Sequence, residues 1–212
     1  MIIRYIKFII PLIILFTACE NIYKYDIVIR NGTIIDGTGN PRFHGDIAIN
    51  GKYITAVGVI DGIGRKEIDA TGKIVSPGFI DTHSHHDWGI FKKPDALAAV
   101  SQGITTIFIG QDGFSNHPLS DFTKKLKRSP VAVNIASYSG HNSMREIVMG
   151  KDFKRIATES EIEKMSEMLN TDLEAGAWGL SSGLEYEPGG FADPEELVAL
   201  TEPLRARRLP YA

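Results

Sequence analysis

Residues 74–87 have the sequence Ile-Val-Ser-Pro-Gly-Phe-Ile-Asp-Thr-His-Ser-His-His-Asp, and the pattern of the whole chain changes at this stretch. Before it, residues 26–72 alternate apolar and polar side chains with period two, which indicates short β-strands. After it, apolar segments alternate with helical ones, which is typical of parallel βα units. The stretch therefore divides the chain into a small β unit, 26–72, and a larger α/β unit, 73–212.

The β unit is predicted to be antiparallel. Asn31-Gly32 and Asn50-Gly51 each separate two alternating segments, and Asn-Gly is a strong signal for a two-residue hairpin turn. A further short strand is expected at residues 66–70. These strands are too few for two closed layers, so we expect the unit to need partner strands from elsewhere in the chain.

The α/β unit is predicted to contain four βα units. Strands are expected at 74–83, 104–109, 131–138 and 177–182, and helices at 94–102, at 160–176 behind a capping box, and after Asp193-Pro194. This alternation favours either a (β/α)8 TIM barrel or a doubly wound sheet. No glycine-rich phosphate loop follows any of the strands, which disfavours a nucleotide-binding sheet.

The length of the chain bounds this prediction. A complete TIM barrel takes about 250 residues, whereas only about 140 residues follow Lys73. We therefore expect a partial barrel of about four units, and we expect the chain to be truncated.

His83 and His85 are candidate metal ligands because they follow the first strand of the α/β unit and are two residues apart. Side chains at this spacing lie on the same side of an extended chain, about 6.5–7 Å apart along the backbone, so the two imidazoles can share one ion. Barrels place their sites at the C-terminal ends of the strands. Taken alone, the two histidines are equally consistent with surface or core positions.

Composition excludes several classes of function. The chain has 212 residues, of which 43% are hydrophobic and 23% charged, and its net charge is -3. These values are typical of a globular protein, and no basic cluster predicts a nucleic-acid partner. The single cysteine, Cys19, excludes an intrachain disulfide and a cysteine-only zinc site.

Residues 1–18 are predicted to be a signal peptide. Arg4 and Lys7 precede an apolar run of 11 residues, 8–18, which is shorter than the roughly 20 residues that span a bilayer as a helix. Small residues stand directly before Cys19, and this arrangement resembles the lipobox of bacterial lipoproteins. The resemblance implies that Cys19 is lipidated, that 19–25 is a tether, and that the protein is exported and anchored at the periplasmic or extracellular side of a membrane.

The Pro-Gly-Phe-Ile-Asp-x-His-x-His string resembles the first barrel strand of the amidohydrolase superfamily. Further blocks, in the same order, are similar to its N-acyl-D-amino-acid deacylase (D-aminoacylase) branch: 31–39, 102–106, 113–115, 140–145 and 181–189. The resemblance implies a β-sandwich followed by a TIM barrel and a site with one or two zinc ions. The implied reaction is hydrolysis of the amide bond of small N-acyl-D-amino acids.

The resemblance also implies roles for individual residues. His83 and His85 would bind the metal, and Asp112 stands where that branch often has a cysteine ligand, although an Asp-Gly turn explains it equally well. Glu185 could be a metal ligand that bridges two ions. A loop role without any ligand remains open for Glu185.

Three further residues are expected at the substrate. His141 is predicted to be a catalytic hydrogen-bond donor near the scissile carbonyl. Arg145 and Tyr186 are predicted to bind the substrate carboxylate, with pairing to a neighbour open for Arg145 and a loop role open for Tyr186.

Two other functions remain open. One is a cyclic-amide hydrolase of the dihydroorotase or hydantoinase kind, which the blocks 140–145 and 181–189 disfavour. The other is a surface lipoprotein that uses an inactive barrel as a binding module. Histidines from the fifth and sixth strands and an aspartate from the eighth, which the superfamily uses, would distinguish an enzyme from a binder, and none of them is in this sequence.

Overall fold

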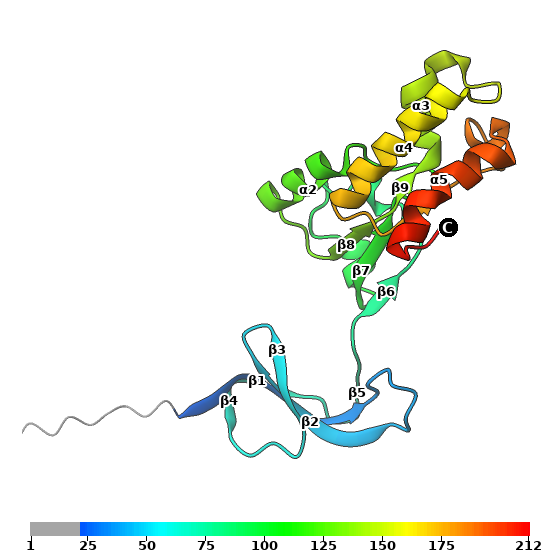
Figure 1. Ribbon diagram of the computed structural model, residues 1–212. Coiled ribbons are helices and arrows are strands. Elements are labelled where there is room, and N and C mark those ends of the chain that lie inside the picture. Colours follow the sequence, from blue (N-terminus) through cyan, green and yellow to red (C-terminus); the bar gives the residue numbers. More distant parts are fainter. Residues whose placement is uncertain (1–21) are drawn as a thin grey trace, which may run out of the picture. The chain divides into compact units, whose positions relative to one another are not determined.

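The computed structural model describes residues 22–212 and divides them into two compact units, with the boundary between Pro77 and Gly78 (Figure 1). The predicted signal peptide and Cys19 lie outside the described residues. No helix among the described residues is long and apolar enough to cross a membrane.

The N-terminal unit is a five-stranded sheet with the order β3-β2-β1-β4, and β5 also pairs with β1. Its strands are β1 (Tyr23–Ile34), β2 (Phe43–Asn50), β3 (Tyr53–Gly58), β4 (Ile63–Asp69) and β5 (Ile74–Val75). β1–β2 and β2–β3 are antiparallel, but β4 and β5 both run parallel to β1. The prediction of an antiparallel unit is therefore wrong for its last two strands, which return to the free side of β1 instead of forming hairpins.

The first predicted hairpin is also wrong, whereas the second is confirmed. β1 continues through Asn31, whose φ is 60°, and its register with β2 shifts there as in a β-bulge. Asp46 holds the bulge by accepting the main-chain N–H of Asn31 at 2.9 Å. The second hairpin joins β2 and β3 as predicted, but its two turn residues are Gly51, at φ 57°, and Lys52, one position later than expected, because Asn50 still pairs with Tyr53. β1 begins at Tyr23, inside the segment predicted to be a tether.

The C-terminal unit is built on parallel strands that follow one another in chain order. β6 (Phe79–Asp81), β7 (Ile104–Ile109) and β8 (Asn134–Ser137) form one sheet, and β9 (Ser139–Gly140) pairs with β10 (Leu180–Ser181). A main-chain hydrogen bond from Trp178 N, just before β10, to Ser137 O of β8 (2.8 Å) joins the two sheets. The strand order in the described residues never reverses, as it would in a doubly wound sheet, so the arrangement is the beginning of a barrel.

The strand predicted over residues 74–83 is broken in two. Its first part, β5, belongs to the sheet of the N-terminal unit, and its second part, β6, opens the C-terminal unit. Pro77 has no main-chain N–H to give to a ladder, and a Cβ on Gly78 would collide with the side chain of Thr105. This Pro-Gly pair therefore ends one unit and starts the next.

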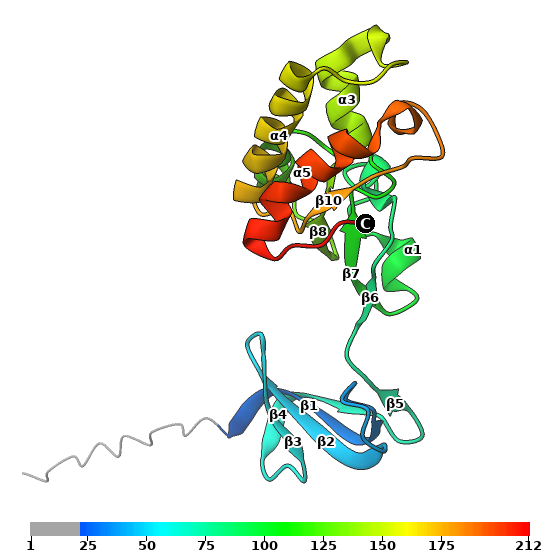
Figure 2. The same cartoon turned by 45° about the vertical axis from the view of Figure 1, so that its right-hand side comes forward.

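The helices of the C-terminal unit pack on these strands, and α4 packs against both α3 and α5 (Figure 2). They are α1 (Leu97–Val100), α2 (Leu119–Arg128), α3 (His141–Met149), α4 (Glu159–Glu174) and α5 (Pro194–Arg207). α5 begins at Asp193-Pro194 as predicted, but the capping box of α4 is Thr158 with Glu161, two residues earlier than expected. The shift arises because Thr158 has the extended backbone that an N-cap requires.

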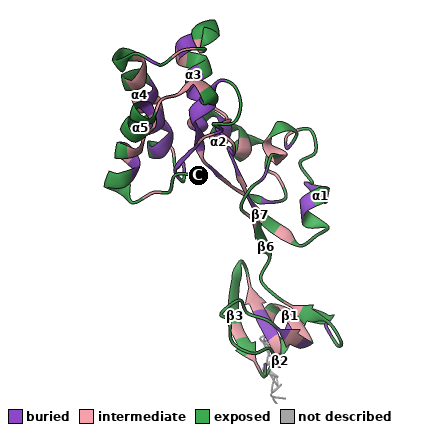
Figure 3. Ribbon diagram, turned by 90° about the vertical axis from the view of Figure 1, so that its right-hand side faces the viewer, coloured by how far each residue is buried: buried purple, intermediate pink, exposed green. Residues whose placement is uncertain are grey.

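The core of the C-terminal unit lies between β7 and the helices, where Figure 3 shows the buried segments. Ile107 and Ile109 of β7, Met165 and Leu169 of α4, and Leu200 of α5 are all fully buried. The apolar stripe predicted on the 160–176 helix is thus confirmed as core. This core fixes the strands whose C-terminal ends carry the polar residues described next.

Candidate functional site

Three of the predicted metal ligands come together at the C-terminal ends of β6 and β7. The ligand atoms of His83, His85 and Asp112 lie within 4.8 Å of one another. Asp112 Oδ2 is 3.3 Å from His83 Nε2 and 3.1 Å from His85 Nε2. The three side chains are partly exposed, so their donor atoms remain accessible from solvent.

The spacing of these donor atoms fits a metal ion. Zinc bonds of about 2.0–2.1 Å to nitrogen and oxygen place neighbouring tetrahedral ligands about 3.3 Å apart. The two observed nitrogen–oxygen separations are close to this value. Two imidazoles and one carboxylate also form a donor set that zinc accepts, with a position left open for another ligand.

The loop after β7 aims Asp112 at the histidines. Asp112 has a φ of 55° and Gly113 a φ of 78°, so the chain passes through two consecutive left-handed residues. Gln111 ties this loop to the neighbouring strand end, since its buried side chain donates to Thr82 O at 2.8 Å and to Phe108 O at 3.2 Å. The turn formed by Asp112 and Gly113 therefore also directs the Asp112 side chain toward the two histidines.

Tyr186 lies beside this group, whereas Glu185 does not. The Tyr186 hydroxyl donates to the main-chain oxygen of Asp112 at 3.2 Å, and its ring stacks on Phe114 with 6.1 Å between centroids. Burial and the nearby charge of Asp112 raise the pKa of Tyr186. Glu185 is exposed, and it is absent from the three-residue group found among the described residues.

His141 and Arg145 lie together at a buried carboxylate. Both are fully buried in α3, where His141 Nε2 is 2.7 Å from Glu196 Oε1 and Arg145 pairs with the other oxygen of the same carboxylate. Arg145 also donates to the main-chain oxygens of Phe153 (3.0 Å) and Arg155 (2.8 Å). Burial of Glu196 opposes its charge, but the hydrogen bonds from His141 and Arg145 outweigh this and lower its pKa.

The roles predicted for His141 and Arg145 at the substrate stay predictions. In this structure both side chains are fully buried and paired with Glu196. The pairing with a neighbour that the sequence left open for Arg145 is the one observed, although the neighbour is Glu196, 51 residues away.

Two buried carboxylates were not predicted from the sequence. Glu196 holds the pair just described, and Asp172 of α4 accepts from Leu119 N (2.8 Å) and Ser139 Oγ (2.6 Å) and lies 2.9 Å from His117 Nδ1. A signal was present in the pattern. Each acid stands at helical spacing within an apolar stripe, Asp172 three residues after Leu169 and Glu196 four before Leu200, and an acid at such a position must have partners in the core.

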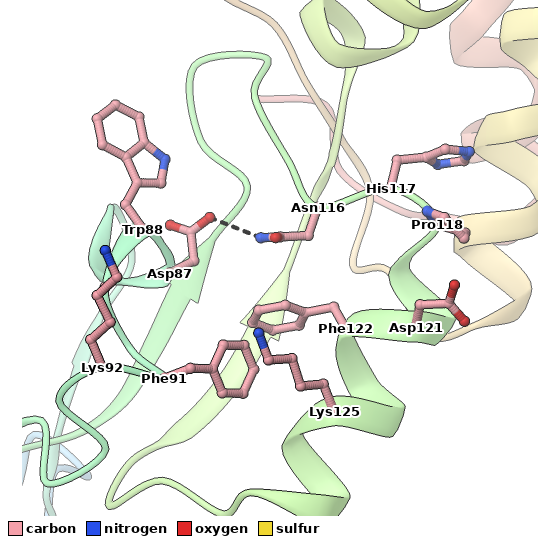
Figure 4. Close-up of a pocket in the computed structure, with 11 residues that line it drawn as sticks. Asp87, Trp88, Phe91, Lys92, Asn116, His117, Pro118, Asp121, Phe122 and Lys125 are labelled. Atoms are coloured by element: carbon pink, nitrogen blue, oxygen red, sulfur yellow. Dashed lines mark hydrogen bonds between the residues drawn. The ribbon is translucent and has the colours of Figure 1, made fainter.

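A cavity of about 450 Å³ opens between the segment after β6 and the start of α2 (Figure 4). Asn116 donates to Asp87 across it at 3.0 Å, and burial raises the pKa of Asp87. Trp88 lies on this side of the site, with its ring 5.5 Å from that of His85. Lys125 lies on the ring of Phe91 at 4.0 Å. The cavity is lined by Asp87, Trp88, Gly89, Phe91, Lys92, Asn116, His117, Pro118, Asp121, Phe122 and Lys125.

The strand order and the three-residue group define this chain as part of a β/α barrel with a candidate metal site. The sequence profile of the amidohydrolase family matches residues 66–202, and the chain belongs to this family. Among curated relatives, it is 37% identical to N-acyl-D-aspartate deacylase of Alcaligenes xylosoxydans xylosoxydans over 206 residues, 86% of this chain and 41% of the relative. It is 32% identical to D-aminoacylase from the same organism, over 89% of this chain and 44% of the relative.

Solved structures give the same result for the fold. N-acyl-D-glutamate deacylase from Bordetella bronchiseptica, complexed with zinc and a phosphonate inhibitor, superposes with a TM-score of 0.85 at 36% identity, over 89% of this chain and 44% of that chain. A crystal structure of D-aminoacylase superposes with a TM-score of 0.82 at 35% identity, over 88% and 44%. The prediction of a partial amidohydrolase barrel behind a small sheet is confirmed. The chain spans less than half the length of the curated relatives it matches.

Proposed function

We propose that His83, His85 and Asp112 hold zinc, and that this chain belongs to an enzyme that hydrolyses the amide bond of N-acyl-D-amino acids. The observation that carries the proposal is the convergence of three donor atoms within 4.8 Å of one another, with both histidine–aspartate separations at tetrahedral ligand spacing. The relatives add chemical support, since the N-acyl-D-glutamate deacylase structure contains zinc. Another D-aminoacylase structure is described as having a binuclear metal centre, which supports one or two ions.

Zinc bound at such a site supplies Lewis acidity, which polarises an amide carbonyl and acidifies water. The chain's own residues set the conditions for this. His83 and His85 must be neutral to donate their Nε2 lone pairs, and the carboxylate of Asp112 supplies the negative charge that offsets part of the ion's charge. Their partial exposure leaves an approach open for a small substrate.

Aromatic side chains flank the ligands on two sides. Phe114 and Tyr186 stack beside Asp112, and Trp88 lies against His85. These rings provide an apolar surface next to polar donor atoms, as sites for small organic molecules usually do. A role for Tyr186 at the substrate carboxylate stays a prediction, and it requires the hydroxyl to exchange its bond to Asp112 O for one to the substrate. Glu185 remains a prediction for a second ion.

Hydrolysis of a substrate panel tests the proposal. Protein produced from the complete reading frame is assayed, with and without added zinc, against N-acetyl-D-aspartate, N-acetyl-D-glutamate, a neutral N-acetyl-D-amino acid, the L enantiomers and a hydantoin. Zinc-dependent cleavage of the D compounds is expected. Turnover of the hydantoin alone would favour a cyclic-amide hydrolase. Binding without any turnover would favour a binding protein with an inactive barrel. Structural likeness does not decide between these, because an L-hydantoinase structure matches at 22% identity and shows the fold alone.

We also propose that the chain is exported and anchored to a membrane through lipid on Cys19. The support is the signal-peptide pattern of residues 1–18 and the small residues before the cysteine. Metabolic labelling with a fatty-acid analogue should mark the wild-type protein. Cys19→Ser should abolish the label and leave an unprocessed precursor, and label that persists in this variant would refute the anchor.

A further inference from the structure

The block Gly140–Arg145 contains a fully buried asparagine that the proposed mechanism does not use. We propose that Asn142 is a positioning residue for the metal site: its side chain joins the loop that carries Asp112 to the loop that carries Tyr186. The inference rests on the proposed function, because it assigns Asn142 a task only if Asp112 is a metal ligand.

The contacts of Asn142 with the Tyr186 loop are specific. Its Nδ2 donates to Gly183 O at 3.1 Å, and Gly183 N donates back to its Oδ1 at 3.4 Å, so the amide pairs with one residue as a neighbouring strand would. Three residues later, the Tyr186 hydroxyl reaches Asp112 O at 3.2 Å. Asn142 itself has no exposed surface, so its partners are all within the protein.

The Asp112 loop lies on the other side of the same amide. A Cβ added to Gly113 would collide with Asn142 Oδ1, which means that the amide lies directly against the main chain of the residue after Asp112. The next residue of α3 continues the contact, since Ser143 N donates to Gly113 O at 3.0 Å. Asn142 is thus packed between the two loops, in contact with a glycine of each.

The Asp112 loop needs such support because of its backbone. The backbone of Asp112 has a φ of 55°, a left-handed conformation that residues other than glycine rarely adopt. Such a conformation persists only where the surroundings over-determine it. The direction of the Asp112 carboxylate therefore depends on contacts made to Gly113 and to Asp112 O, and Asn142 supports both, the first directly and the second through Tyr186.

The start of α3 is itself held in place. His141, the residue before Asn142, lies 2.7 Å from Glu196 of α5, and Arg145 pairs with the same carboxylate. These contacts fix the first turn of α3 and leave Asn142 little freedom to follow a shift of either loop. The residues of the block that looked like substrate ligands thus anchor the helix, and Asn142 transmits that anchoring to the site.

Zinc affinity of the intact chain tests this role without any assay of turnover. Affinity is measured by competition with a chromophoric chelator for wild type, Asn142→Ala and Asn142→Asp. Asn142→Asp keeps the shape but replaces the Nδ2 donor with an acceptor that faces Gly183 O. Both variants should bind zinc about 10- to 100-fold more weakly, as is usual when the support of a metal ligand is lost. Asn170→Ala is the matched control, since Asn170 Nδ2 likewise donates to a main-chain oxygen, that of Ser166, at 2.9 Å but within α4; its affinity should be unchanged.

A double-mutant cycle separates positioning from general weakening of the fold. If Asn142 acts through Asp112, then Asn142→Ala should cost little further zinc affinity in the Asp112→Asn background. Additive losses, or wild-type affinity in a folded Asn142→Ala protein, would overturn the proposal. If Asp112→Asn itself leaves zinc binding unchanged, Asp112 is not a ligand, and the positioning role proposed for Asn142 fails with it, whereas loss of zinc in His83→Ala and His85→Ala tests the metal site separately.

Tyr186→Phe keeps the test available if substitution of the buried asparagine prevents folding. The change removes only the hydroxyl that bonds to Asp112 O and leaves the core untouched. Zinc affinity should fall by a smaller factor than in Asn142→Ala, and the effect should vanish in the Asp112→Asn background. Unchanged affinity in Tyr186→Phe would show that the link between the two loops does not position Asp112.

Discussion

Two clusters in the C-terminal unit contain the same kinds of side chain in opposite surroundings. His83, His85 and Asp112 are 39–58% exposed, whereas His141, Arg145 and Glu196 have no exposed surface. In both clusters an imidazole nitrogen lies within hydrogen-bonding distance of a carboxylate oxygen. Residue type alone therefore does not identify a metal site.

Burial separates the two roles, because a buried charge must be compensated by partners within the protein, whereas an exposed charge is solvated by water. A buried carboxylate needs partners, and Glu196 has two that use both of its oxygens. An exposed pair in water contributes little to stability, so the groups of the first cluster can exchange their mutual contacts for a ligand at small cost. We therefore expect the exposed cluster to matter for metal binding and the buried one for folding.

The largest expected effect is on activity, at the exposed cluster. In protein from the complete reading frame, His83→Ala or His85→Ala should lower bound zinc and cut deacylation by orders of magnitude, since loss of a ligand removes the source of carbonyl polarisation and of the nucleophile. Metal analysis and initial rates provide the measurement. Full activity with unchanged zinc content in either variant would remove these residues from the site.

The buried cluster should respond in stability instead. Glu196→Ala leaves the Arg145 guanidinium buried without its carboxylate, and breaking a buried pair in this way costs about 3–5 kcal/mol in the free energy of unfolding. Chemical denaturation measures the change. Glu195→Ala is the matched control, because Glu195 is an acid in the same first turn of α5 and is exposed. Equal stability of the two variants would contradict a structural role for Glu196.

Asp112 allows the exposed cluster to be tested more finely. Asp112→Asn should weaken zinc binding about tenfold or more, because a neutral amide replaces an anionic ligand. Asp112→Cys should retain or strengthen it, because thiolate is a softer donor that zinc favours. Isothermal titration with zinc is the measurement. Equal affinity in wild type and Asp112→Asn would leave only the turn-forming role of this residue.

The smallest effect is a pH dependence that arises at the buried cluster. The pKa of Glu196 is lower in the folded protein than its ordinary value of 4.5. The corresponding stability is complete above that ordinary value and is lost as the pH falls through the lower folded pKa. Unfolding free energies measured between pH 6 and 3 should therefore fall less steeply in Glu196→Gln than in wild type. If the unfolding free energy falls equally between pH 6 and 3 in the two proteins, other carboxylates cause the pH dependence.

Local sequence determined those features that depend on neighbours within a few residues. Asp193-Pro194 starts α5, and the Asn-Gly signal at residues 50–51 marks the hairpin between β2 and β3. Both follow from backbone geometry at short range, through a cap or a turn. The convergence of His83 and His85 does not follow from strand alternation, because β6 ends at Asp81 and His85 has φ -111° and ψ 21°. The amidohydrolase resemblance, which rests on the order of several such blocks, also gave the partial barrel.

Tertiary structure decided the rest. Asn31-Gly32 has the same residues as the second Asn-Gly signal but became a bulge, because Asp46 on the next strand accepts its main-chain N–H. The strand over 74–83 was divided between two sheets, which no local pattern could show. His141 and Arg145 are buried in pairs with Glu196, a residue more than 50 positions away in the sequence. The physical reason is common to all three: hydrogen bonds and burial depend on partners that the chain brings together only after it has folded.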